Sequence, residues 1–151
     1  MTVGITFGRF RIFHAGHINL IQRMIDENSE VIIGVAKTSE AQRSAQVIRY
    51  WFGNSVTVEY FNNPFQMMSA LELKLTPRFY AGSDRYDMLS RLKNYHEVDI
   101  IPVERSLCSS TVCREILSTA GTLDDLISSG LAVDHNHAMI IYAQFILERV
   151  K

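Results

Sequence analysis

Short runs of apolar residues alternate along this chain with longer segments in which apolar residues recur every three or four positions. The short runs are rich in β-branched and aromatic residues, which is typical of strands. They predict strands at residues 3–7, 30–36, 55–60, 78–81 and 98–103. The periodic segments predict helices at residues 16–27, 39–52, from 64 onward, 86–95, 110–120, 123–129 and 134–150.

The order of these elements is strand then helix, repeated five times and followed by further helices. Such an order predicts a parallel sheet with right-handed crossovers. The run at residues 30–36 (E-V-I-I-G-V-A) is apolar almost throughout, as expected of a parallel strand buried on both faces. We therefore expect an α/β fold, a Rossmann-like doubly wound parallel sheet of about five strands with helices on both faces. Ligands bind such sheets at the carboxyl ends of strands.

The composition narrows the functional classes. The chain has 151 residues, one domain's worth, and carries 15 Lys and Arg against 16 Asp and Glu. This near-neutral balance argues against a nucleic-acid partner. No apolar run reaches the roughly 20 residues of a membrane span, and the N-terminus does not resemble a signal peptide. Cys108 and Cys113 lack the spacing of a zinc set, so we expect no protein-bound metal and a cytoplasmic protein with reduced thiols.

The last predicted helix, residues 134–150, is apolar nearly all round. Such a helix is either central to its fold or packed against another subunit. A homo-oligomer is the corresponding prediction.

The segment after the first strand, G-R-F-R-I-F-H-A-G-H at residues 8–17, carries the strongest candidate chemistry. Gly8 lets a backbone amide approach a ligand closely. Gly16 leaves amides open at the start of a helix, where an anion is favoured. His14 and His17 add side-chain donors for the same anion, and the arginine at position 9 adds charge. This pattern predicts phosphate binding.

Two later strand ends carry weaker signals. Gly82 and Asp84, after the strand at 78–81, suit contact with a ribose or a base, although Gly-Ser-Asp is also common in turns. The run Ser109, Ser110 and Thr111 either caps a helix or turns hydroxyls and amides toward phosphates. Arg114, about one helical turn further on, would clamp phosphate oxygens. Neither a GxxxxGK[ST] loop nor a GxGxxG loop is present in the sequence.

Taken in order, these motifs resemble the HxGH nucleotidyltransferase superfamily, which includes nicotinamide-mononucleotide adenylyltransferases, phosphopantetheine adenylyltransferases and small cytidylyltransferases. Residues 8–17 resemble the family pattern G-x-F-x-P-x-H-x-G-H, residues 80–85 its G-x-D element, and residues 109–114 its S-S-T-x-x-R. The three matches come in the family's order. Ile12 stands where the family commonly has proline, which questions the stiffness of the loop more than its chemistry.

The resemblance implies one nucleotidyltransferase domain over residues 1–151 that uses ATP with Mg²⁺ and a small phosphate-bearing acceptor, in NAD biosynthesis. It implies adenylyl transfer to nicotinamide or nicotinate mononucleotide by direct in-line attack, with pyrophosphate as the leaving group. His14, His17 and Arg114 would be catalytic. The nucleotide would be bound by Gly8, Arg9, Phe10, Gly16, Gly82, Asp84, Ser109, Ser110 and Thr111.

Alternatives remain open. Cytidylyl transfer is one, and a phosphopantetheine-type acceptor is another, although that group usually has threonine where His14 stands. A nucleotide sensor without catalysis would use the same residues. For the acceptor's phosphate the family suggests Lys37, Arg43 and Arg49, which are otherwise solvated helix charges. The remaining histidines lie outside any motif and are predicted at the surface: His96, His135 and His137.

Overall fold

The computed structural model describes residues 1–82, 85–104, 109–119 and 121–149. The chain forms two compact units. The sheet unit comprises Met1–Arg9 and Ile21–Arg105, and the helical unit comprises Phe10–Leu20 and Ser106–Lys151. Helix α1 (Ala15–Glu27) begins in the helical unit and ends in the sheet unit.

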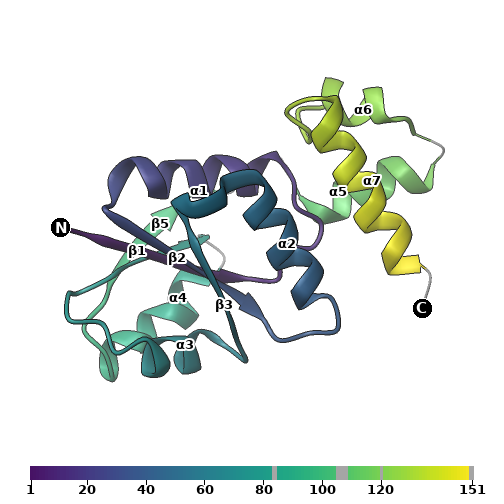
Figure 1. Cartoon of the computed structure of the whole chain (residues 1–151). Coiled ribbons are helices and arrows are strands. Elements are labelled where there is room, and N and C mark those ends of the chain that lie inside the picture. Colours follow the sequence, from purple (N-terminus) through teal and green to yellow (C-terminus); the bar gives the residue numbers. More distant parts are fainter. Residues whose placement is uncertain (83–84, 105–108, 120, 150–151) are drawn as a thin grey trace. The chain divides into compact units, whose positions relative to one another are not determined.

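Five parallel strands build the sheet unit (Figure 1). Their bounds are β1 (Val3–Gly8), β2 (Glu30–Ala36), β3 (Thr57–Phe61), β4 (Arg78–Gly82) and β5 (Asp99–Val103). The order across the sheet is β3-β2-β1-β4-β5, so β1 lies at the centre. The α/β, doubly wound fold class predicted from the element order is thereby confirmed.

Helices cover both faces of this sheet (Figure 1). The sheet-unit part of α1 and helix α2 (Ala41–Phe52) lie on one face, while α3 (Pro64–Leu71) and α4 (Tyr86–Leu89) lie on the other. Single 3₁₀ turns, Gly53–Ser55 and Ser90–Asn94, follow α2 and α4. A core of strand and helix side chains fills the α3/α4 face: Val3, Ile5, Ile32, Phe61, Met67, Met68, Phe79, Ala81, Leu89, Leu92, Val98 and Ile100.

One glycine of β2 permits close packing on that face. A Cβ atom at Gly34 would lie 2.6 Å from the Met67 sulfur and 3.1 Å from a ring carbon of Phe7. Such contacts are too tight for an unadjusted structure, so the absence of a side chain at residue 34 sets how closely Met67 and Phe7 approach the sheet.

Local sequence signals explain the helix starts unevenly. α3 begins at Pro64, as the sequence predicted, and the Asn63 side chain caps it by accepting the Gln66 N–H at 2.8 Å. The helix predicted from residue 39 begins two residues later: α2 starts at Ala41 after Glu40, which makes no side-chain capping bond.

The ladders on the two sides of β1 differ. Six residue pairs join β1 to β2, whereas the pairing of β1 with β4 comprises Gly4 with Arg78 and Ile5 with Phe79. Beyond these pairs the Thr6 hydroxyl donates to the Tyr80 carbonyl at 2.8 Å. This is the position where the strand order reverses, and the carboxyl ends of strands at such a position commonly form a ligand-binding crevice.

The helical unit is built from the loop before α1 and three helices, α5 (Ser110–Ser118), α6 (Leu123–Ser128) and α7 (His135–Arg149). A separate apolar cluster holds it together: Ile12, Cys113, Leu117, Leu126, Leu131, Ala132, Ala138, Ile141 and Phe145. Part of the apolar surface of α7 stays exposed, including Met139, Tyr142 and Ile146. The predicted homo-oligomer stays a prediction.

Within the residues that the structure describes, no helix is long and apolar enough to cross a bilayer.

Candidate functional site

The two motif histidines, both in the helical unit, form a stacked pair. Their ring centroids lie 3.9 Å apart with an interplanar angle of 19°. Nδ1 of His14 accepts the Gly16 N–H at 3.1 Å, and Nδ1 of His17 accepts the His14 N–H at 3.2 Å. An imidazole nitrogen that accepts a hydrogen bond carries no proton, so the neutral form of each ring has its proton on Nε2. Two N–H donors are thereby assigned to adjacent rings.

Electrostatics keep both rings neutral. Burial, with a smaller contribution from nearby His137, lowers the pKa of His14 to about 4. Burial and the two neighbouring histidines hold the pKa of His17 well below its ordinary value. At neutral pH these side chains therefore act as hydrogen-bond donors without a positive charge of their own.

Aromatic rings surround the pair. The Phe13 ring lies nearly parallel to that of His17, at 5.6 Å and 11°, and Phe10 meets His17 edge-on at 5.2 Å. Phe10 is almost fully buried and its backbone is left-handed, with φ of 52°. Non-glycine residues in this conformation cluster at functional sites. The predicted role of Phe10 in nucleotide binding stays a prediction; its observed role is to support His17.

The serine-rich motif reaches the same loop. The Ser110 hydroxyl contacts the carbonyl oxygens of Arg11 and Ile12 at 3.1 and 3.2 Å. Nη2 of Arg114 lies 3.4 Å from the Arg11 carbonyl oxygen, which accepts from both side chains. The two motifs, about 100 residues apart in sequence, are thus joined through the backbone that precedes His14.

Arg114 is also paired with an acid. Its Nε and Nη2 atoms donate to the two carboxylate oxygens of Glu148 at 2.9 and 2.7 Å. This bond raises the pKa of Arg114 above its ordinary value. Arg11 approaches the same carboxylate, with Nε 3.5 Å from Oε1. Two guanidinium groups therefore share one anion.

Other predicted phosphate ligands of this unit have local roles. The Ser109 hydroxyl accepts the Val112 N–H at 3.1 Å and caps α5, while Thr111 is exposed. The sequence predicted an open amide at Gly16, and this prediction is wrong, because the Gly16 N–H donates to His14 Nδ1.

Ile12, at the position where the family commonly has proline, is fully buried in the core of the helical unit. Its carbonyl group and that of Arg11 are both held by Ser110. Packing and hydrogen bonds therefore restrain the loop at the point where the sequence raised a question about its stiffness.

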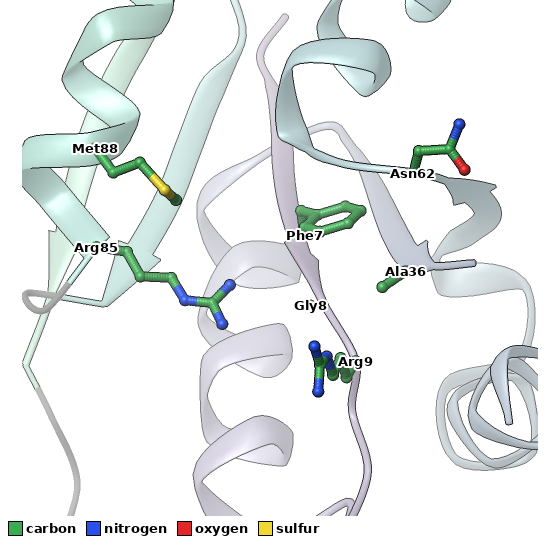
Figure 2. Close-up of a pocket in the computed structure, with 7 residues that line it drawn as sticks. All are labelled: Phe7, Gly8, Arg9, Ala36, Asn62, Arg85 and Met88. Atoms are coloured by element: carbon green, nitrogen blue, oxygen red, sulfur yellow. The ribbon is translucent and has the colours of Figure 1, made fainter. Parts of the chain in front are cut away.

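A second feature is a pocket of about 370 Å³ in the sheet unit, at the carboxyl ends of the strands. Its lining residues are Phe7, Gly8, Arg9, Ala36, Asn62, Arg85 and Met88. Figure 2 shows the guanidinium groups of Arg9 and Arg85 approaching the space beside Phe7 from the end of β1 and the start of α4. The described lining residues include two arginines and one aromatic ring and no acid, so this part of the pocket suits an anionic ligand with a flat or apolar part.

Two residues that the sequence predicted to bind the nucleotide, Gly8 and Arg9, line this pocket, and a third, Gly82, ends β4. Their role in nucleotide binding stays a prediction. Asp84 lies outside the described residues. The predicted acceptor ligands are elsewhere in the sheet unit: Lys37 and Arg43 are exposed, and Arg49 donates to the Val58 carbonyl at 3.0 Å.

Several residues escaped sequence reasoning. His137, predicted at the surface, is fully buried. Its Nε2 atom bonds to the Phe13 carbonyl oxygen at 2.7 Å, which compensates for the loss of water. The partner lies 124 positions away, so no local pattern could have identified it. Glu148 was hidden in a helix that the sequence marks mainly by apolar residues. Arg85 and Met88 follow the G-x-D element, and that position was the only available signal.

Across residues 1–82, 85–104, 109–119 and 121–149, no group of three or more His, Cys, Asp or Glu side chains is placed to hold a metal ion.

Comparison with known proteins places these features in context. A family model described as cytidylyltransferase-like matches residues 5–52, which include β1, the histidine motif and β2. No curated protein matches the sequence. Among solved structures, a candidate nicotinate-nucleotide adenylyltransferase from Vibrio parahaemolyticus is similar, with TM-score 0.68 and 11% identity over 96% of each chain.

Two further structures show the same fold. One is a bifunctional NMN adenylyltransferase/ADP-ribose pyrophosphatase from Francisella tularensis in complex with AMP and a Mn ion, with TM-score 0.63 and 16% identity over 98% of this chain and 52% of that one. The other is a lipopolysaccharide core biosynthesis protein from Thermoplasma volcanium, with TM-score 0.54 and 19% identity over 70% of this chain and 98% of that one. The solved structures confirm the α/β fold, and the family-model match agrees with the resemblance to the nucleotidyltransferase superfamily over residues 5–52.

Proposed function

We propose that this protein is a nucleotidyltransferase that transfers the adenylyl group of ATP to nicotinamide or nicotinate mononucleotide and releases pyrophosphate. The observation that carries the proposal is the stacked pair His14 and His17, whose neutral rings present N–H donors on the loop to which Arg114 is bonded. The family-model match and the adenylyltransferases among the structural relatives support the reaction class.

The chemistry follows from the state of these groups. A phosphate oxygen of the acceptor attacks the α-phosphorus of the triphosphate, a new P–O bond forms, and the bond to the β-phosphate oxygen breaks in line. Neutral imidazole donors stabilise the charge that develops on the α-phosphate oxygens. Neither ring serves as a base, because Nδ1 accepts a hydrogen bond and Nε2 already holds the proton. Positioning and charge stabilisation therefore supply the rate enhancement.

Arg114 and Ser110 are assigned to the β- and γ-phosphates of the leaving group, with Arg114 supplying the positive charge. The pocket of the sheet unit, with Arg9 and Arg85, is assigned to the anionic acceptor. Mg²⁺ is proposed to arrive on the triphosphate, whose oxygens are its preferred ligands, with few ligands from the protein.

A direct test measures pyrophosphate release with purified protein, Mg²⁺ and each pairing of ATP or CTP with nicotinamide mononucleotide, nicotinate mononucleotide or phosphopantetheine. The proposal predicts turnover with ATP and a pyridine mononucleotide. Turnover with phosphopantetheine alone would reassign the acceptor. ATP binding without pyrophosphate release from any pairing would instead identify a nucleotide sensor.

Cytidylyl transfer is the second candidate, because the family model that matches residues 5–52 is cytidylyltransferase-like. The same panel separates the two, since release with CTP and not with ATP would replace the adenylyl assignment.

A further inference from the structure

Helix α7 carries three polar side chains on one face of an otherwise largely apolar helix. His137, Gln144 and Glu148 are seven and four residues apart, close to two turns and one turn of helix. They point toward the centre of the helical unit: His137 is fully buried and the Glu148 side chain is only 16% exposed. Burying a polar group destabilises the fold unless the group is hydrogen-bonded. The hydrogen-bond partners of these three residues, the polar stripe of α7, therefore indicate their role.

Two members of the stripe hold a single residue of the histidine loop. Gln144 Oε1 accepts the Phe13 N–H at 2.9 Å, and His137 Nε2 bonds to the Phe13 carbonyl oxygen at 2.7 Å. The Val133 N–H donates to His137 Nδ1 at 3.0 Å, which assigns the ring proton to Nε2 as the donor. Both backbone groups of Phe13 are therefore fixed by α7, and the Phe13 ring stacks on His17.

The third member fixes the arginine. Glu148 engages Nε and Nη2 of Arg114 in a two-point bond, and Nη2 also lies near the Arg11 carbonyl oxygen. A planar guanidinium bonded along one edge has its orientation set. Within the described residues the remaining nitrogen, Nη1, makes no hydrogen bond, so its two N–H donors can face a ligand.

We propose that α7 is the positioning element of the phosphate site, in which His137 and Gln144 fix the histidine loop and Glu148 orients Arg114 toward a bound polyphosphate. All three are positioning residues, since they act through Phe13 and Arg114. The inference rests on the proposed function to the extent that both require a phosphate ligand at these residues.

If Glu148 instead competed with phosphate for the arginines, its removal would have the opposite effect on binding. A carboxylate that simply occupied the anion site would compete with phosphate. Its removal would raise the local charge of the Arg11, Arg114 and Glu148 group from +1 to +2 and tighten anion binding. Loss of a positioning carboxylate weakens binding despite that gain in charge. The sign of the change therefore separates the two roles.

The experiment compares the full chain with Glu148→Gln, Arg114→Lys and the double variant, with Glu115→Gln on the exposed side of α5 as the matched control. Calorimetry measures the dissociation constant of inorganic tripolyphosphate, and steady-state kinetics separates kcat from KM for ATP. We expect Glu148→Gln to weaken tripolyphosphate binding about tenfold and to raise KM by a similar factor, with kcat changing less. The same substitution should have little effect in the Arg114→Lys background, and the control should match the unmodified protein.

Unchanged or tighter tripolyphosphate binding by Glu148→Gln would overturn the inference, as would an equal loss in the Arg114→Lys background or a failure of the unmodified protein to bind tripolyphosphate. If Glu148→Gln does not fold, Glu148→Asp replaces it, because the shorter carboxylate keeps the charge but displaces the guanidinium. Tripolyphosphate binding as tight as in the unmodified protein would again count against the inference.

The two proposals can fail separately. Glu148-dependent tripolyphosphate binding without pyrophosphate release from any substrate pair would remove the proposed function and leave the inference. Pyrophosphate release that Glu148→Gln does not affect would remove the inference and leave the function.

Discussion

The two units of this protein present their charged groups in opposite ways. In the sheet unit, Arg9 and Arg85 are exposed at the rim of a pocket, and no acid is present among the lining residues that the structure describes. In the helical unit, Arg11 and Arg114 share the carboxylate of Glu148, and the histidines are held neutral by burial. The sheet unit therefore offers loosely held charge that water and salt can screen, whereas the helical unit offers donors whose directions are set in advance.

This contrast predicts that the two groups of residues affect different kinetic parameters. Substitutions in the pocket should change mainly the affinity for a substrate, and substitutions of His14 or His17 themselves should change mainly the rate of the chemical step.

Matched leucines probe whether the cores are independent. Leu126 in the helical unit and Leu92 in the sheet unit are both fully buried. Replacing either by alanine should lower the free energy of unfolding of its own unit by about 2–5 kcal/mol, because a cavity is left behind. Denaturant unfolding followed by hydrogen exchange at individual amides should show loss of protection confined to one unit in each variant. Equal loss of protection in both units would contradict the independence of the two cores.

His17→Ala should produce the largest loss of activity. Removing one preorganised donor typically lowers a rate by about 10²–10³, and we expect at least that loss in kcat for pyrophosphate release, with the fold intact by circular dichroism. His135→Ala, at an exposed histidine of the same unit, is the control and should keep full activity. Near-normal turnover of His17→Ala would remove this residue from the chemistry. Arg114→Ala is expected to lose a similar factor.

Acidification should destabilise the protein through His14. Its pKa falls from 6.5 to about 4 on folding, so between these values the unfolded chain binds a proton that the folded chain does not. Above pH 6.5 the ring is neutral in both states and its titration leaves the free energy of unfolding unchanged. As the pH falls toward 4, protonation of the unfolded chain lowers the free energy of unfolding by up to about 3 kcal/mol. Urea unfolding at a series of pH values should show a smaller dependence of stability on pH for His14→Asn than for the unmodified protein. An identical slope for His14→Asn would show that His14 titrates normally.

Arg85→Ala should have the smallest effect. We expect KM for the mononucleotide to rise about tenfold, equivalent to about 1.4 kcal/mol, with kcat nearly unchanged, and the difference should shrink at high salt. Arg91→Ala, an exposed arginine in the turn after α4, should leave KM unaltered. A fall in kcat with unchanged KM would reverse the assignment of the pocket to binding.

The sequence predicted most elements of the fold, because their signals are local. The bounds of β2 were obtained at both ends, since its apolar run has polar residues on either side. The predicted helix at 86–95 is in fact α4 followed by a 3₁₀ turn, which share the same approximate periodicity. The order β3-β2-β1-β4-β5 was not predicted, because it depends on which strands pair in space.

The candidate site was predicted only where a motif marks it. His14, His17 and Arg114 stand in sequence patterns, although their roles remain to be tested. His137, Gln144 and Glu148 make their contacts across 34 to 131 positions, and such partners leave no periodic or compositional trace. Long-range hydrogen bonds of this kind are visible only once the chain is folded.

Gly34 does not line the pocket, but a side chain at this position would change the space inside it. Because a methyl group there would press on Phe7 and Met67, and Phe7 lines the pocket, Gly34→Ala is expected to push the Phe7 ring into the space available for a substrate. A single methyl group at residue 34 would thus narrow the pocket from a position outside its lining.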